Sequence, residues 1–215
     1  MKAISLLLVA TLLFSCKKDV IRGSGNTITE TKTVSPFTAV ETHYDIKAII
    51  TYGATQQLEV SGYENLLNIL ETPVENGVLK LKFNQNYNTV RNVNVVARIQ
   101  LPAITATTIH GSNNIEVSNF AGGNAFTAQI HGSGDIRVNN SAFQTATLRI
   151  NGSGDIDARG LQAQEATTNI NGSGDVSITV TGKLNATING SGNINYWGSP
   201  VVEATIHGSG RVIKK

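Results

Sequence analysis

The sequence has a single cysteine among its 215 residues, and it is poor in aromatic and in charged side chains. One cysteine excludes a disulfide framework within the chain and any zinc site built from several cysteines. Lys and Arg number 17 against 15 Asp and Glu, which leaves a net charge of +2. Because nucleic-acid binding needs a strongly positive surface, this near balance argues against a nucleic-acid partner.

Long apolar runs are also missing. The almost wholly apolar stretch 4–13 is too short to cross a bilayer as a helix, and with the basic Lys2 before it the pattern predicts a secretion signal over residues 1–15. The segment Leu13-Phe14-Ser15-Cys16 resembles a bacterial lipobox, which implies that the signal is cut before Cys16 and that Cys16 carries lipid. The alternative is an ordinary signal peptide cut elsewhere, with an incidental thiol.

The lipobox predicts where the protein works. Several acyl chains on one residue anchor a protein durably, whereas a single chain does so only marginally. Lys17, not Asp, follows Cys16, which fits transport to the outer membrane of a Gram-negative cell. We therefore expect an outer membrane lipoprotein, facing the periplasm or the cell surface, with residues 16–33 as the lipidated Cys and a polar tether.

The strongest pattern in the chain is a repeat. Six copies of Ile-x-Gly-Ser-Gly-x-Ile, or of a close variant, begin at Ile109, Ile130, Ile150, Ile170, Ile188 and Ile206, at spacings of 18 to 21 residues. Apolar and polar residues alternate on both sides of each copy, which predicts two short strands joined by a tight corner. Such a unit cannot bury its apolar side alone, so the copies must stack.

A period of about 20 residues predicts an all-β fold, a parallel β-helix of about six coils of 18–21 residues over residues 104–215. Chirality rules favour a right-handed coil. The six leading isoleucines would form one interior column facing Ile115, Ile136, Ile156, Val176, Ile194 and Val212. Both glycines of each corner are expected to supply positive φ, with Asn113 as the substitute in the first copy. An antiparallel meander with Gly-Ser-Gly hairpins is the competing geometry.

Residues 34–103 lack the repeat but alternate in the same way. Asn76-Gly77 between two such runs predicts a two-residue hairpin, and residues 63–70 predict one or two helical turns. We expect this N-terminal β segment to cap or continue the coil, so that 34–215 form one domain.

The lipobox, the segment Pro36-Phe37-Thr38-Ala39-Val40 and the repeated corners together resemble the bacterial lipoproteins called putative auto-transporter adhesin, head GIN domain. The resemblance covers about residues 34–213. It implies an all-β, β-helix-like domain on the cell envelope with no established enzymatic activity, and it assigns no functional residue beyond Cys16.

Stacking would align acidic side chains on the outer surface. Asp135, Asp155 and Asp175 occupy the same repeat position, about one strand spacing apart, with Asp157 on the same face and Arg137 one coil earlier. The row could be a solvated corner whose carboxylates cap turn amides, a calcium site, or a glycan-cleaving carboxylate cluster. Trp197 could be a sugar-stacking platform or a lid over its coil.

A second row would hold imidazoles and amides. The residue after each leading isoleucine is His110, His131, Asn151, Asn171, Asn189 or His207. Stacked Asn side chains predict an amide ladder. The alternative is a metal pair of His110 and His131, which would be a poor site with no carboxylate or Cys nearby. We expect no cofactor and no metal.

Familiar catalytic signatures are missing: the chain has no His-Glu-x-x-His and no Gly-x-Ser-x-Gly. We therefore predict a non-enzymatic, lipid-anchored envelope protein with an adhesin-like or scaffolding role, whose partner is a glycan or a protein of the envelope or exterior. A glycan-active β-helix enzyme and a calcium- or carbohydrate-binding module are the alternatives. A homo-oligomer stays open.

Overall fold

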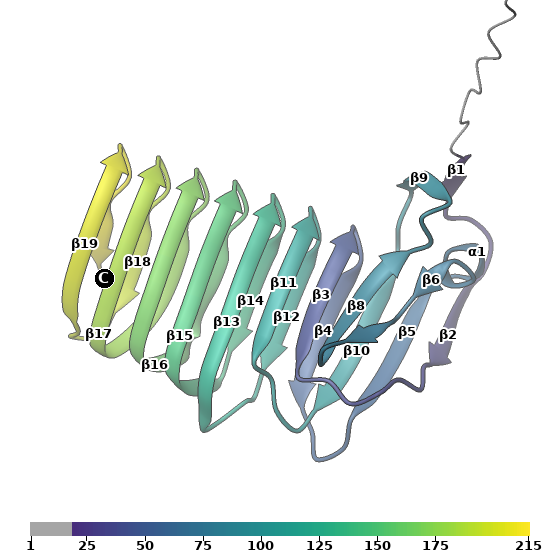
Figure 1. The fold of residues 1–215 in the computed structure, drawn as a ribbon, viewed down its shortest axis with the longest axis horizontal. Helices are drawn as coiled ribbons and strands as arrows, with labels where there is room; N and C mark the ends of the chain where they lie inside the picture. Colours follow the sequence, from purple (N-terminus) through teal and green to yellow (C-terminus); the bar gives the residue numbers. More distant parts are fainter. Residues whose placement is uncertain (1–18) are drawn as a thin grey trace, which may run out of the picture.

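The computed structural model describes residues 19–215, which form a β-solenoid of about five turns with an irregular β segment at its N-terminal end (Figure 1). The predicted all-β, parallel β-helix is confirmed. The six repeat copies are separated by five complete turns, since a turn runs from one leading isoleucine to the next. No helix within the described part of the chain is long and apolar enough to span a membrane.

Two parallel columns of strands build the repeat region. The strands that lead into each corner are β11 (Ala106–Gly111), β13 (Gly123–Gly132), β15 (Ser141–Gly152), β16 (Ile156–Gly172), β17 (Val176–Gly190) and β19 (Val201–Gly208). The strands that leave the corners are β12 (Asn114–Ser118), β14 (Asp135–Asn139), the first parts of β16 and β17, β18 (Ile194–Trp197) and β20 (Val212–Lys214). The strongly matched sequences therefore lie directly above one another.

The interior column of isoleucines forms as predicted in five of its six positions. Ile150 pairs in register with Ile130 on one side and Ile170 on the other, and all three side chains are fully buried. The expectation is wrong for Ile206, which is 41% exposed. Ile206 lies on β19 in the last coil, where the described residues supply no further coil to cover it.

The two glycines of each corner have different roles. Gly152 has φ of 143°, in the region that residues with a Cβ resist, and this agrees with the prediction. Gly154 has no positive φ, so the expectation is wrong for the second glycine. A Cβ at Gly154 would overlap the carbonyl oxygen of Gly134 in the neighbouring coil. The second glycine is therefore required by the close approach of two backbones.

Asn113 replaces the second glycine in the first copy for a reason other than the one we expected. Its φ is not positive. It is buried, accepts a hydrogen bond from Thr42 Oγ1 at 2.9 Å, and donates from Nδ2 to the carbonyl oxygen of Tyr44 at 2.7 Å. Asn113 thus joins the repeat to a differently shaped corner in the N-terminal segment.

The N-terminal segment both continues the coil and closes its end. Strands β3 (Ala39–Tyr44) and β4 (Lys47–Tyr52) pair in parallel with β11 and β12, and β8 (Val78–Phe83) and β10 (Val96–Leu101) extend the two columns by one more level. Antiparallel strands then end each column. In one column, β7 (Val74–Glu75) and β6 (Leu70–Glu71) pair with β8. In the other, β5 (Gln57–Tyr63) pairs with β10, and β2 (Thr27–Thr31) pairs with β5. Antiparallel pairing covers the edge that a further coil would occupy.

Local predictions in this segment are confirmed. Asn76 and Gly77 both have positive φ and join the antiparallel strands β7 and β8 as a two-residue turn. The short helix α1 spans Glu64–Leu67.

The expected polar tether is wrong from Asp19 onward. Strand β1 (Asp19–Arg22) pairs in parallel with β9 (Tyr87–Arg91), and β2 pairs with β5. Half-buried Ile21 and Ile28 pack against the core, so these residues belong to the folded structure. Residues 1–18, with the predicted signal and Cys16, lie outside the described part of the chain.

Candidate functional site

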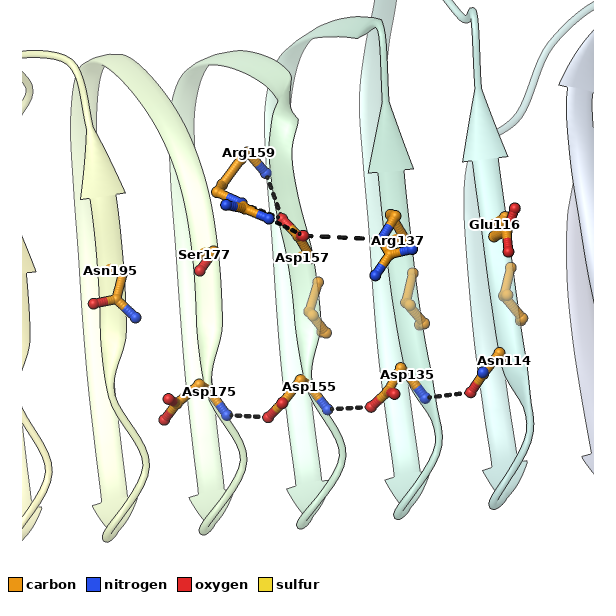
Figure 2. A pocket seen from close by; sticks show the side chains of 13 residues that line it. Asn114, Glu116, Asp135, Arg137, Asp155, Asp157, Arg159, Asp175, Ser177 and Asn195 are labelled. Atoms are coloured by element: carbon orange, nitrogen blue, oxygen red, sulfur yellow. Dashed lines mark hydrogen bonds and ion pairs between the residues drawn. The ribbon is translucent and has the colours of Figure 1, made fainter. Parts of the chain in front are cut away.

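A groove of about 330 Å³ runs along the outer side of the strands that leave the corners (Figure 2). Residues of β12, β14, β16, β17 and β18 line it, so it crosses several consecutive coils. Alternation along each strand separates the lining from the core: Ile115, Ile136 and Ile156 point inward and are buried. The side chains between them face outward and form two polar rows.

The first row lies at the corners, and its members hold the coils together. Asp135 Oδ1 accepts a hydrogen bond from the backbone N–H of Asp155 at 3.0 Å, and Asp155 Oδ1 accepts one from Asp175 N–H at 2.7 Å. Asp175 Oδ1 continues the series to Asn193 N–H at 2.6 Å. Figure 2 shows the run from Asn114 to Asp175 as one line of such contacts. The structure therefore brings the three aspartates into register, and each carboxylate caps an amide of the next coil.

The second row lies two residues further along each strand. Its members are Glu116, Arg137, Asp157, Ser177 and Asn195. Arg159 binds Asp157 through two contacts, Nε to Oδ1 at 2.8 Å and Nη2 to Oδ2 at 2.6 Å, while Arg137 Nε lies 3.9 Å from Oδ2. The hydrogen bonds from Arg159 hold the pKa of Asp157 below its usual range, although partial burial opposes the shift.

Arg137 lies near the acidic row as the repeat predicts, whereas the repeat does not predict Arg159. Arg159 lies in the return between two repeat copies, where the chain varies from coil to coil. A basic residue two positions after an outward-facing aspartate on a strand is the signal that could have found it, since both side chains share one face.

Trp197 does not line the groove. It ends β18 and pairs with Thr179 of the preceding coil, which also contains Ser177. Its side chain is half-buried. Its neighbour Tyr196 is the member of the pair that packs against the core. The structure therefore puts Trp197 at the periphery of the polar rows.

The predicted amide ladder is present. Asn171 Nδ2 donates to Asn151 Oδ1 at 2.9 Å, and Asn189 Nδ2 donates to Asn171 Oδ1 at 2.8 Å. The rings of His110 and His131 stack at the end of this row. The expectation that no carboxylate lies near them is wrong, because Glu41 Oε1 is 3.5 Å from His110 Nε2.

Comparison with known proteins agrees with the fold. A putative adhesin from Bacteroides fragilis superposes with a TM-score of 0.71 at 20% identity, covering 91% of this chain and 100% of that one. A protein from Parabacteroides distasonis titled putative lipid binding protein gives a TM-score of 0.59 at 24% identity, covering 92% and 100%. A putative adhesin from Parabacteroides merdae gives 0.57 at 21%, covering 92% and 99%. Identities this low show the shared fold alone.

No curated protein matches the chain significantly. The family described as putative auto-transporter adhesin, head GIN domain, matches residues 36–200. That range contains the N-terminal β segment from Pro36 and five of the six repeat corners. The family's description fits a protein of the cell envelope or surface. This chain belongs to the putative auto-transporter adhesin, head GIN domain family.

Proposed function

We propose that this protein is a non-enzymatic, lipid-anchored binding protein of the cell envelope with an adhesin-like role, and that its groove binds an extended glycan. Cys16 would carry the lipid, so that the membrane holds the N-terminal end of the rod. The solenoid would then present the polar rows to a polymer outside the membrane.

The observation that carries this proposal is the regular polar lining of the groove. Carboxylate, amide, hydroxyl and guanidinium groups follow one another at the strand spacing, about 4.8 Å, over several coils. Sugars offer hydroxyls that both donate and accept, so such a lining can bind successive residues of a chain molecule. A lipid tail would need an apolar lining, whereas the outward-facing side chains of this groove are polar.

Two features favour binding over glycan cleavage. Asp135, Asp155 and Asp175 each commit one oxygen to a backbone amide of the next coil. A glycosidase also needs a carboxylic acid whose pKa is raised, so that it holds a proton to donate. Arg159 lowers the pKa of Asp157 instead, so Asp157 is ionised at neutral pH.

A glycan array with the full chain carrying Cys16→Ser would test the groove, because this change removes the lipid. We expect binding to a defined glycan, and a loss of at least about 10-fold in affinity with Arg137→Gln combined with Asp157→Asn, whose charges line the groove. Arg149→Gln is the control, since Arg149 is exposed on β15 outside the lining. An array without a bound glycan, or equal loss in the control, would contradict the proposal. Release of reducing ends from a bound glycan would identify an enzyme instead.

The anchor has its own test. Growth with labelled palmitate should label the full chain and leave Cys16→Ala unlabelled, and that variant should leave the membrane fraction. A chain that stays unlabelled at Cys16 would show an ordinary signal peptide.

A further inference from the structure

Three imidazole rings stack on the outer surface where the N-terminal segment meets the repeats. His43 of β3, His110 of β11 and His131 of β13 share one register position. The ring centroids of His43 and His110 are 4.8 Å apart with planes at 11°, and those of His110 and His131 are 5.0 Å apart at 9°. The stack continues the amide ladder toward the N-terminal end.

Glu41 adds a carboxylate to this stack. It precedes His43 by two residues on β3, so both side chains leave the same face of the strand. Glu41 Oε1 lies 2.7 Å from His43 Nε2 and 3.5 Å from His110 Nε2. The three possible ligand atoms all lie within 4.8 Å of one another, and all three residues are half-buried.

His131 is engaged elsewhere. Its Nε2 lies 2.6 Å from Gln129 Nε2, and its Nδ1 lies 3.4 Å from Asn151 Nδ2. Amide nitrogens only donate and a neutral imidazole accepts at one nitrogen, so His131 accepts from one of these two amides. His131 is also not among the residues whose ligand atoms lie together. The cluster with free coordinating capacity is Glu41, His43 and His110.

Glu41 supplies the negative charge of the cluster. Lys80 is the nearby cation, and its Nζ binds Glu75 Oε2 at 2.7 Å. No Lys or Arg of the described residues forms an ion pair with Glu41.

We propose that Glu41, His43 and His110 bind one divalent d-block cation, of which Zn²⁺ is the representative. Two imidazoles and a carboxylate are a ligand set that zinc takes with further positions left for water or another ligand. Imidazole ligands disfavour calcium and magnesium, which prefer all-oxygen sites. Coordination at about 2.1 Å requires the two rings to tilt toward each other and the His43 proton to reside on Nδ1.

This cluster is separate from the groove, which lies on the strands that leave the corners. A bound ion would connect β3 to β11, and so the N-terminal segment to the repeats. Because it would bind the folded chain, it would also raise the melting temperature, and the rise would grow with the logarithm of the ion concentration relative to Kd.

Calorimetric titration of Zn²⁺ into the full chain carrying Cys16→Ser tests the site, since that background removes the single thiol. We expect one ion per chain, and Co²⁺ in its place should give a visible absorption band from nitrogen and oxygen ligands. His110→Asn is the decisive variant, because three repeat copies already have Asn at this position and the fold accepts it. It should weaken binding by more than about 100-fold, beyond the loss that removal of an outer-shell partner produces.

Glu41→Gln should weaken binding as His110→Asn does, and both variants should melt normally without metal. His207→Asn is the matched control, since it makes the same change on the exposed last coil and should leave Kd and the Co²⁺ spectrum unchanged. Absence of binding, unchanged affinity in His110→Asn, or equal losses in His110→Asn and His207→Asn would each overturn the site.

Discussion

Adjacent coils approach each other closely at every corner, but the contact differs between the repeat and its junction with the N-terminal segment. In the repeat, Gly154 lets two backbones approach so closely that no side chain fits. At the junction, Asn113 occupies the equivalent position and binds Thr42 and Tyr44 through its side chain. Identical neighbours can stack through the backbone, whereas unlike neighbours need a side chain that spans the difference.

The two ends of the solenoid differ in the same manner. Antiparallel strands cover the N-terminal end, and Ile206 is exposed at the other. Irregular sequence is what closes a coil, because a further matched copy would only extend it.

The largest expected effect concerns the regular corners. Gly154→Ala should destabilise the fold by at least about 3 kcal/mol, because its Cβ would overlap the carbonyl oxygen of Gly134. Gly122→Ala is the control: Gly122 has φ of 82° with no atom near its Cβ, so only about 1 kcal/mol is expected. Urea unfolding measures both. Equal costs would show that close approach does not govern the second glycine.

Making the junction regular should also destabilise the protein. Asn113→Gly would remove the bonds to Thr42 and Tyr44 and leave a buried hydroxyl unsatisfied, which costs about 2 kcal/mol. Asn76→Gly, in the exposed hairpin with φ of 53°, should change stability by less than about 0.5 kcal/mol. Urea unfolding measures both variants. An unchanged free energy of unfolding in Asn113→Gly would mean that a glycine corner packs as well at the junction as in the repeats.

A stabilising change is expected next to the junction. Thr107 is buried, and its Oγ1 has no hydrogen-bond partner among the described residues. Thr107→Val should therefore raise the free energy of unfolding by about 1 kcal/mol. Thr168→Val is the matched control within the repeats, because Thr168 Oγ1 contacts the carbonyl oxygen of Asn185 at 3.4 Å. Thermal melts that show equal gains would refute the distinction.

The smallest effect belongs to the groove. The pKa of Asp157 is lowered in the folded state, so its contribution is present above the ordinary Asp pKa of about 3.9 and is lost as pH falls through the lower folded value. Since the pair with Arg159 is partly exposed, we expect less than about 1 kcal/mol. Asp157→Asn should lose correspondingly less stability than the unmodified chain on acidification. Urea unfolding at a series of pH values measures this. A constant difference in free energy of unfolding between the two proteins at every pH would disprove the contribution.

The interior column was predictable from sequence, and so was the acidic row. Ile130, Ile150 and Ile170 repeat within a period-two pattern, and stacking matched copies forces Asp135 and Asp155 to adjacent coils. The Glu41, His43 and His110 cluster was not predictable, because Glu41 and His43 lie outside the repeat and no period relates them to His110. The ion pair of Asp157 and Arg159 was not predictable either, because Arg159 lies in the return between two copies and the returns differ in sequence.

By itself, the sequence determined the stacked coil and the isoleucine column of its inner coils, because repetition at a fixed period leaves one register that buries their apolar faces. The family followed from the resemblance of the lipobox, residues 36–40 and the repeated corners. Only the tertiary structure decided which strands cap the first coil, how Asn113 bridges the junction and which carboxylate meets the imidazoles. Those contacts join segments of unlike sequence, and their pairing depends on the shape of the whole chain.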